Sequence, residues 1–443
     1  MKKGIMPSLF VLMIACHLAS AQINIVSVVA VDSVIADFPV NFSAISAKNW
    51  QFVAYYNKDR NLTVASRKIP EKRWNYKILP TKVGWDNHNY ITMAFDRDYN
   101  IHVSGNMHAD TMKYFKTTKP LDISTFERVL PLVNIADELR STYPNFMKDA
   151  QNRLIFTYRK GGSGNGNTIS NYYDEQKGKF SRLTDAPLFD GLNEMSAYIK
   201  GPTLGPDGLF HLLWVWRDTP DAETNHDLSY ARSKDLIHWE TAAGERVTLP
   251  ITPHKKQFTI DPVPPMGGAI NGGNALFFDQ KQPIVCYHKY DENGKHQLYL
   301  SKFMDGKWRI TKVTNWDFRW SFSGSGSLTS ELKILSASLK DNNTIEIEYW
   351  QSKNGFGRVL VDATSLTPLE DKPVENPENK LFTTELMKPT RSESSVKWLK
   401  IPNSDNAKSY FAFRWEAMGI RRFYEKREKP VQPFLMQLYE FSK

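Results

Sequence analysis

The chain has 443 residues, of which 41% are hydrophobic and 13% aromatic, and its formal net charge at pH 7 is +9. This length is enough to bury a large core, either in two domains or in one large repeat fold. The modest excess of lysine and arginine is scattered, without a basic run or a basic helix. It therefore suits an acidic partner and argues against a nucleic-acid-binding protein.

Residues 1–21 are predicted to be a secretory signal peptide. Lys2 and Lys3 precede an apolar run over Leu9–Ala15, and Ala19–Ala21 offers a small-x-small cleavage site. The apolar run is too short to cross a bilayer as a helix, and no later stretch is long and apolar enough, so we expect no membrane span. We expect the mature chain to be secreted or periplasmic.

Removal of this leader would leave residues 22–443, with a formal net charge of +7 after the loss of Lys2 and Lys3. Cys286 would then be the only cysteine, so no intrachain disulfide is expected. We also expect a monomer.

A repeated pattern indicates the fold class. Helical periodicity is almost absent, and a turn rich in Asp, Asn and Gly repeatedly precedes an alternating or apolar strand. The copies lie at 57–65, 96–104, 149–158, 205–214, 279–287, 341–349 and 404–414. Seven copies predict an all-β fold, a seven-bladed β-propeller formed as a single domain over residues 22–443. The one linker candidate, Pro368–Asn379, is interpreted as a loop between copies.

A further turn supports the blades. Ser233-Lys234-Asp235, followed by Trp239, resembles a degraded Asp-box, the hairpin signature of sialidase-like propellers.

Two histidines are the main candidates for chemistry. His88 precedes the predicted strand 90–95, and His108 follows the predicted strand 101–104. In an antiparallel pair, the start of one strand and the end of the next lie at the same edge, so both imidazoles can reach one end of a blade. Each can exchange a proton near neutral pH. His102, inside the second strand, is instead interpreted as structural.

The next segments add a tyrosine and an arginine. Tyr143 leads into a strand that ends at Arg159, and the glycine-rich stretch Gly161–Gly166 follows. That stretch lacks the spacing of a phosphate loop and no helix follows it, so it is expected to allow a sharp turn or a close backbone approach. Arg159 could hold a carboxylate by two parallel hydrogen bonds, or form a surface ion pair.

Two aromatic and charged groups are candidates for sugar binding, although aromatic residues on propeller strands also pack between blades. Their members predicted to bind substrate are Arg217, His226, Arg319 and Trp320. No HExxH motif, cysteine cluster or EF-hand spacing is present, so neither a metal nor another cofactor is expected to be required. A structural calcium ion is compatible with the fold but is not indicated by the sequence.

The histidine region resembles a known family. The runs Asp86–Asn89 and Ile101–His108 are similar to those of BNR-repeat propellers, which include ulvan lyases, L-rhamnose-α-1,4-D-glucuronate lyases and propeller α-L-rhamnosidases. The segments 214–221 and 228–233 look most like the rhamnose–glucuronate branch. No histidine occurs between Ile23 and Asn87, where the rhamnosidase branch has its catalytic histidine, and this counts against rhamnosidase chemistry.

The resemblance implies a polysaccharide lyase that cleaves rhamnose–glucuronate linkages in an acidic glycan. In such a lyase Arg159, helped by Tyr198, would neutralise the uronate carboxylate. Either His108 or Tyr143 would remove the C5 proton, and His88 would serve as the acid or as a partner of the carboxylate. The expected partner is an acidic polysaccharide or oligosaccharide that contains uronic acid and rhamnose.

Two alternatives stay open at this point. A glycoside hydrolase usually needs two carboxylates that flank the bond, and Asp86, Asp110, Asp218 and Asp227 are available without forming a clear pair. A noncatalytic sugar-binding propeller would use the same pocket without cleaving a bond.

Overall fold

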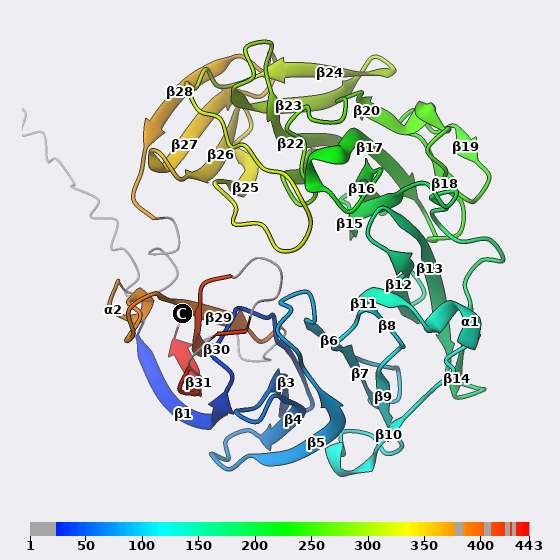
Figure 1. Cartoon of the computed structure of the whole chain (residues 1–443), viewed down its shortest axis with the longest axis vertical. Coiled ribbons are helices and arrows are strands. Elements are labelled where there is room, and N and C mark those ends of the chain that lie inside the picture. The colour runs from blue at the N-terminus through cyan, green and yellow to red at the C-terminus, as the bar shows by residue number, and fades with distance from the viewer. Residues whose placement is uncertain (1–23, 377–383, 403–408, 421–425, 428–430, 443) are drawn as a thin grey trace, which may run out of the picture.

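The computed structural model describes residues 24–376, 384–402, 409–420, 426–427 and 431–442. The predicted signal peptide lies outside these residues. Within them the regular secondary structure is almost entirely β-strand, and the strands form a ring of seven blades (Figure 1). This confirms the all-β, seven-bladed propeller. No helix among the described residues is long and apolar enough to cross a membrane.

The first three blades run in chain order from residue 43 to residue 182. Blade 1 contains β2 (Ser43–Ala47), β3 (Trp50–Tyr56), β4 (Asn61–Lys68) and β5 (Asn75–Lys82). Blade 2 contains β6 (Ile91–Phe95), β7 (Ile101–Gly105), β9 (Tyr114–Thr117) and β10 (Phe126–Arg128). Blade 3 contains β11 (Ser141–Lys148), β12 (Leu154–Gly162), β13 (Asn165–Asp174) and β14 (Lys179–Arg182).

The next three blades follow in the same order. Blade 4 contains β15 (Ser196–Leu204), β16 (Phe210–Arg217), β17 (Asn225–Ser233) and β18 (Trp239–Glu240), extended by β19 (Arg246–Val247) and by β20 (Thr259–Asp261). Blade 5 contains β21 (Asn274–Asp279), β22 (Gln282–Tyr290), β23 (His296–Met304) and β24 (Lys307–Lys312). Blade 6 contains β25 (Leu332–Asp341), β26 (Thr344–Gln351), β27 (Gly355–Asp362) and β28 (Pro368–Pro373).

Blade 7 closes the ring by combining the two ends of the described chain. Its strand order is β1-β31-β30-β29, from β29 (Ser394–Lys400), β30 (Ser409–Met418), β31 (Phe434–Ser442) and the N-terminal strand β1 (Ile25–Val34). β1 pairs antiparallel with β31, with Val28 opposite Tyr439. The first strand thereby covers the edge that the last blade would otherwise expose.

Each sequence repeat falls in a different blade. In blades 2 to 6 the turn joins the first strand to the second. The copy at 57–65 differs, because it joins the second and third strands of blade 1. Only the strand half of the copy at 404–414 is described, as β30. The linker candidate was also interpreted wrongly in part, because Pro368–Pro373 pairs with β27 as an edge strand.

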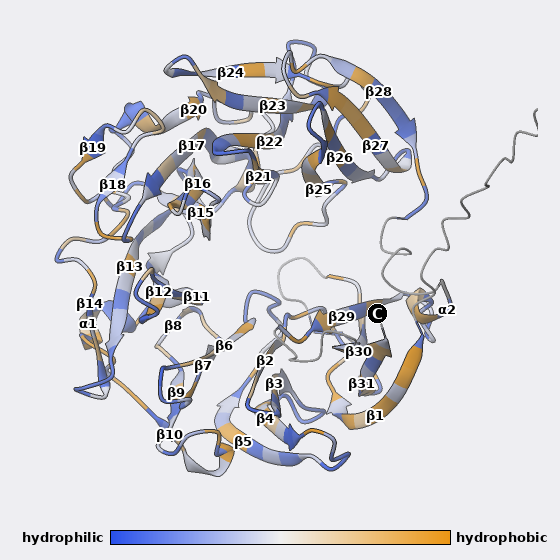
Figure 2. Cartoon of the chain, turned by 180° about the vertical axis from the view of Figure 1, so that it is seen from behind, coloured by the Kyte–Doolittle hydropathy of each residue, from blue (hydrophilic) through white to orange (hydrophobic). Residues whose placement is uncertain are grey.

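The second strand of a blade is more buried than its outermost strand, because the faces of neighbouring blades pack together over the middle of each blade. All eight residues of β16 are buried, whereas β5, at the rim, has exposed positions along most of its length. Figure 2, which views the ring from behind, shows apolar and polar stretches alternating along the strands. The Asp-box-like turn joins β17 to β18, where Asp235 accepts hydrogen bonds from the amides of Ile237 and His238 at 2.9 and 2.8 Å.

Two strand pairings between blades bring the candidate residues to one region. The short strand β8 (His108–Asp110) follows β7 of blade 2 but pairs with β11 of blade 3, placing His108 opposite Thr142. Blades 3 and 4 are joined by one parallel pairing of β13 with β15, Gly166 opposite Ser196.

The remaining elements are short. They are α1 (Ile135–Glu138), α2 (Thr384–Met387) and the 3-10 turns η1 (Ile123–Thr125), η2 (Ala222–Thr224) and η3 (Lys256–Phe258).

Candidate active site

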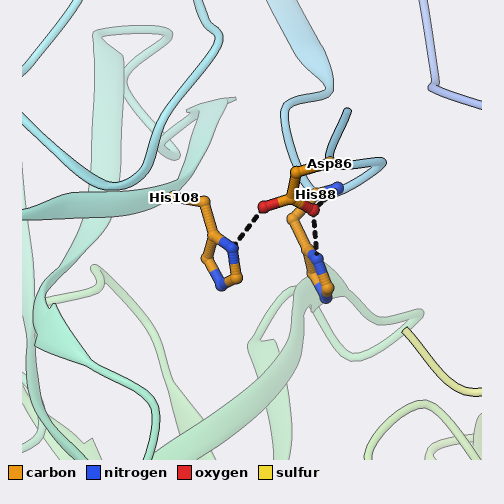
Figure 3. Close-up of side chains that lie close together, drawn as sticks. All are labelled: Asp86, His88 and His108. Atoms are coloured by element: carbon orange, nitrogen blue, oxygen red, sulfur yellow. Dashed lines mark hydrogen bonds and ion pairs between the residues drawn. The ribbon is translucent and has the colours of Figure 1, made fainter. Parts of the chain in front are cut away.

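A carboxylate joins the two predicted histidines. The Asp86 Oδ1 atom accepts a hydrogen bond from His88 Nδ1 at 2.7 Å, and Oδ2 accepts one from His108 Nδ1 at 2.5 Å (Figure 3). The backbone amide of His88 also donates to Oδ1, which closes a tight turn two residues long. The imidazole rings stack with centroids 4.4 Å apart and an angle of 22° between their planes. The expected meeting of both imidazoles at one end of a blade is therefore seen.

This arrangement fixes which nitrogen each imidazole presents. Both Nδ1 atoms face Asp86, so both Nε2 atoms lie on the far sides of the rings, and both histidines line a cavity of about 170 Å³. Burial raises the pKa of the Asp86 carboxyl, but hydrogen bonds from His108 and His88 outweigh burial and hold it well below 3.8. An ionised carboxylate at Nδ1 orients each ring and fixes its tautomer.

We expect Asp86→Asn to lower kcat by about 10²- to 10⁴-fold, because an amide offers one acceptor oxygen to two imidazole N–H groups. Steady-state kinetics would measure this. Asp218→Asn is the matched control, since Asp218 also accepts from a histidine, His226 Nε2 at 2.9 Å, outside the cavity. Equal losses in the two variants would contradict a special role for Asp86.

The low pKa of Asp86 also predicts an effect of pH on stability. A carboxyl whose pKa is lower in the folded state contributes stability above its unfolded pKa of about 3.9, and this is lost as the pH falls through the folded value. Below about pH 4 the free energy of unfolding of the wild type should therefore fall more steeply than that of Asp86→Asn, as denaturant titrations would show.

Tyr143 is held against the histidines by an irregular backbone. The register of β11 against β12 shifts between Thr142 and Asn145, and Tyr143 adopts a φ of +57°. Such a conformation is uncommon for a bulky residue and is often associated with functional sites. The Tyr143 ring lies 6.3 Å from the His88 ring and 6.5 Å from the His108 ring. Burial, together with Tyr198, raises the pKa of Tyr143 to about 12.

Arg159 lies beside this tyrosine, on β12, and is only 4% exposed. Its guanidinium carbon is 4.8 Å from the centre of the Tyr143 ring, and Nη1 donates to Tyr198 Oη at 3.3 Å. Nε and Nη2 are buried and have no hydrogen-bond partner among the described residues. Arg159 lines a cavity of about 510 Å³ together with His88, Tyr143 and Tyr198. A pair of unpaired N–H groups on one edge of an arginine is suited to a carboxylate.

The glycine-rich stretch makes room for this arginine. A Cβ on Gly166 would lie 3.0 Å from Cγ and Cδ of Arg159 and 2.8 Å from the Lys160 carbonyl oxygen. A side chain at this position would therefore displace the arginine stem. This is a close backbone approach, as the sequence indicated, but to a side chain of the protein.

Tyr198 lies between two guanidinium groups. The carbon of the Arg217 group is 4.1 Å and that of the Arg159 group 5.6 Å from the ring centre, and Ser163 Oγ is 2.5 Å from the Tyr198 hydroxyl. Burial raises the pKa of Tyr198, but Arg217 and Arg159, with the hydrogen bond to Ser163, bring it below 10. Tyr198 is therefore a stronger acid than Tyr143.

We expect Arg217→Gln to raise the pKa of Tyr198, because it removes the nearer of the two positive charges. The measurement is a pH titration by ¹³C NMR with tyrosine labelled at Cζ, in which the Tyr198 resonance is assigned by its loss in Tyr198→Phe. Arg232→Gln, which removes an arginine paired with Glu240 elsewhere in blade 4, should leave that resonance unchanged. An unchanged or lower pKa in Arg217→Gln would contradict this account.

The other predicted binding residues lie elsewhere. His226 is held between Asp218 and Asp227, at 2.9 and 3.1 Å. Arg319 stacks on the Tyr290 ring in a separate cavity of about 240 Å³. Trp320 is 3% exposed, in an aromatic cluster beside blade 5. The structure therefore brings together His88, His108, Tyr143, Arg159, Tyr198 and Arg217.

Sequence reasoning gave Asp86 only a possible hydrolytic role, and it missed Ser163 and Asn271 as site residues. The Asp-x-His spacing of Asp86 and His88 was the available signal, because it places both side chains on one turn. Asn271 accepts a hydrogen bond from Arg217 Nη2 and lines the larger cavity. It belongs to the loop before blade 5, 54 residues away in sequence, which no local pattern reveals.

Asp86, His88 and His108 could together hold a metal ion. Each offers one ligand atom, and these atoms lie within 4.8 Å of one another. A carboxylate and two imidazoles are suitable ligands for a first-row transition metal. Both carboxylate oxygens, however, already accept imidazole hydrogen bonds.

The fold and this site define a propeller with a histidine–aspartate–histidine centre beside an arginine-lined cavity. The chain belongs to the BNR repeat-containing family, whose sequence model matches residues 50–316. This confirms the resemblance found in the sequence. No curated protein matches the chain.

Solved structures share the fold. The polysaccharide lyase Uly1 is similar with a TM-score of 0.61 and 14% identity, over 91% of this chain and 90% of that chain. An ulvan lyase of polysaccharide lyase family PL25, bound to -[GlcA(1-4)Rha3S]-, is similar with a TM-score of 0.56 and 14% identity, over 92% and 94%. At this identity the likeness shows the fold.

Proposed function

We propose that this protein is a polysaccharide lyase that cleaves rhamnose–glucuronate linkages in an acidic glycan by β-elimination. The fold is shared with an ulvan lyase whose structure holds a glucuronate–rhamnose ligand. The predicted leader over residues 1–21 suits the proposal, because export would bring the enzyme to a polymer outside the cell.

The observation that carries this proposal is the unpaired edge of Arg159. A buried arginine with two unsatisfied N–H groups is costly unless a ligand completes its hydrogen bonds. A uronate carboxylate would complete them with two parallel bonds. Neutralising that carboxylate makes the proton on C5 more acidic and stabilises the enolate-like charge that develops when it leaves. Tyr198, whose hydroxyl accepts a hydrogen bond from Arg159, would support the same carboxylate.

The neighbouring groups suit the two proton transfers. The base must take the C5 proton, and an acid must protonate the oxygen that leaves C4 as the C4–C5 double bond forms. Because burial raises its pKa to about 12, Tyr143 is protonated at neutral pH and suits the acid. An imidazole Nε2 atom then suits the base. We assign this role to His108, with His88 sharing Asp86 and contacting the carboxylate.

Hydrolysis is less well supported. No aspartate or glutamate lines the two cavities at the histidines, among the residues that the structure describes. Of the four carboxylates considered from the sequence, Asp86 is engaged by both histidines, Asp110 pairs with Lys113 at 3.7 Å, and Asp218 and Asp227 contact His226. A pair of carboxylates flanking a glycosidic bond, which most glycosidases use, is therefore lacking in this region.

The test is ultraviolet absorbance during incubation with rhamnose-capped glucuronate glycans, followed by analysis of the sugars. The proposal expects a growing signal from an unsaturated uronate. Free rhamnose without this signal would mean hydrolysis, and saturable binding without product would mean a sugar-binding propeller. Either result would overturn the proposal.

A further inference from the structure

A separate cavity of about 240 Å³ combines charged and apolar side chains. It lies where the loops between β16 and β17, between β20 and β21, and between β24 and β25 meet, the last being the loop that leads into β25 in Figure 1. These loops contribute Glu223, Met266 and Arg319, and Tyr290 at the end of β22 lines the same cavity. None of its lining residues also lines a cavity at the histidines, so it is a site of its own among the described residues.

The guanidinium group of Arg319 is held in place on one wall of this cavity. Its carbon lies 3.9 Å from the centre of the Tyr290 ring. Nε donates to Ser321 Oγ at 3.2 Å, and Nη1 donates to the Gly294 carbonyl oxygen at 2.5 Å. Nη2 has no hydrogen-bond partner among the residues that the structure describes, and the residue is exposed. The group therefore keeps a free N–H edge in a fixed orientation.

The Tyr290 ring that supports this arginine is itself fixed. Its hydroxyl donates to the Trp320 carbonyl oxygen at 2.7 Å. Gly268 packs on the ring: its φ is +81°, and a Cβ there would lie 2.7 Å from Cγ and Cδ1 of Tyr290. A glycine is therefore required for this close approach, and the stack of ring and guanidinium is built before any ligand arrives.

Glu223 adds an unpaired carboxylate to the cavity. Its backbone is fixed, because its amide donates to Asp221 Oδ1 at 3.0 Å and its carbonyl oxygen accepts from Met266 N at 2.7 Å. Its side chain makes no hydrogen bond or ion pair with the described part of the chain, Arg319 included. A carboxylate and a guanidinium edge that do not satisfy each other leave one acceptor and one donor for a ligand. Neighbouring hydroxyl groups match both, because a hydroxyl donates and accepts.

The remaining surface of the cavity is apolar. Met266 is 66% exposed although its amide is bound to Glu223. Phe322 is half-buried, with its ring 4.8 Å from that of Trp320. Apolar contacts beside a few fixed polar groups are typical of small-ligand sites, and aromatic rings pack on the C–H groups of sugars.

We propose that this cavity is a second sugar-binding site, which holds a neutral rhamnose residue of the glycan away from the bond that is cleaved. The identity of the glycan rests on the proposed function. The Glu223 carboxylate would repel a uronate or a sulfate ester, whereas it accepts from one hydroxyl of rhamnose while Arg319 donates to its neighbour. Rhamnose is a 6-deoxy sugar, and its methyl group would contact Met266 and Phe322.

One glycan can reach both this cavity and the histidines. Ser323 lines the second cavity, and Ser325, two residues further on, lines the cavity at His88 and His108. Two residues of extended chain span at most about 7 Å. The second site is therefore adjacent to the catalytic centre without being part of it.

The first experiment measures binding without turnover. The protein is labelled with ¹³C at the methionine methyl groups, and the Met266 resonance is assigned by its loss in Met266→Leu. We expect methyl α-L-rhamnoside to shift this resonance saturably, and methyl β-D-glucuronide to leave it unchanged. No saturable shift, or an equal response to both sugars, would overturn the second site whether or not the protein is a lyase.

The matched variant in this titration is Glu223→Ala. It should raise the dissociation constant of methyl α-L-rhamnoside by about tenfold, because it removes a charge-assisted hydrogen bond. Thermal unfolding should be unchanged, since the side chain has no partner among the described residues. Glu245→Ala, at an exposed glutamate between β18 and β19, is the control and should bind as the wild type does. A wild-type dissociation constant in Glu223→Ala would overturn the role of this carboxylate.

The second experiment compares two substrates, a rhamnosyl-glucuronide and a longer glycan that carries a further rhamnose residue. Arg319→Gln should raise KM for the longer glycan by about tenfold, with kcat and the KM of the short substrate unchanged. Arg309→Gln, at an exposed arginine paired with Asp305 on blade 5, is the control. An unchanged KM for the longer glycan, or equal increases for both substrates, would overturn the proposal. Failure of the proposed function looks different, since neither substrate would give an unsaturated-uronate signal while the titration still reports on the site.

Discussion

Replacing His108 with alanine should lower kcat by about 10²- to 10⁴-fold with little change in thermal stability. The imidazole is the proposed base, whereas its ring is only partly buried and contributes little to a core. Steady-state turnover of a rhamnose-capped glucuronate substrate, alongside thermal unfolding, would measure both effects. His238→Ala is the control, because His238 makes a similar contact with Asp235 at 2.8 Å on an exposed hairpin.

Chemical rescue separates catalysis from structure in this variant. His108 lines an open cavity, so added imidazole can enter the space that the missing side chain leaves. It should therefore restore part of the activity of His108→Ala. Rescue should follow the concentration of neutral imidazole if the missing group is a base. Full activity of His108→Ala without imidazole would show that His108 is not the base.

Arg159→Lys should lower kcat/KM by about 10²- to 10³-fold although the positive charge is kept. A lysine offers a point charge in place of the planar edge formed by Nε and Nη2, so it cannot make two parallel bonds to a carboxylate. The measurement is kcat/KM on the same substrate, with kcat and KM separated.

The control for this variant is Arg232→Lys, at an arginine whose Nε donates to Glu240 at 2.7 Å on the outer part of blade 4. It should keep wild-type kinetics. Wild-type kinetics in Arg159→Lys as well would contradict the carboxylate clamp and leave the unpaired edge of Arg159 without a function.

Much of the fold could be predicted from the sequence, because turn chemistry is local. Asp and Asn side chains bond the amides two to four residues ahead, as Asp96 does with Asp98 and Asn100, and this pattern marks hairpins in blades 1 to 6. The pattern does not show which hairpin of a blade carries the turn. For this reason the sequence could not show that the copy at 57–65 joins the second and third strands of its blade, one strand later than the copies in blades 2 to 6. The closure by β1 carries no local signal at all.

The site could be predicted in part, for a similar reason. His88 and His108 flank consecutive strands, so antiparallel pairing alone brings them together. Arg217 and Tyr198 meet through the pairing of β15 with β16, which a hairpin also favours. Arg319 and Trp320 have suitable chemistry but do not line the cavities at the histidines, because their loop folds back on blade 5. The positions of long loops depend on tertiary contacts that sequence patterns do not show.

Elimination and hydrolysis are distinguished most sharply by running the reaction in H₂¹⁸O and analysing the products by mass spectrometry. Elimination breaks the C4–O bond without adding water. We therefore expect an unsaturated uronate product and a released sugar, neither carrying ¹⁸O introduced by bond cleavage, once spontaneous exchange at the new reducing end is subtracted with an unlabelled sugar control. One ¹⁸O atom fixed in every cleavage, with no unsaturated product, would contradict it.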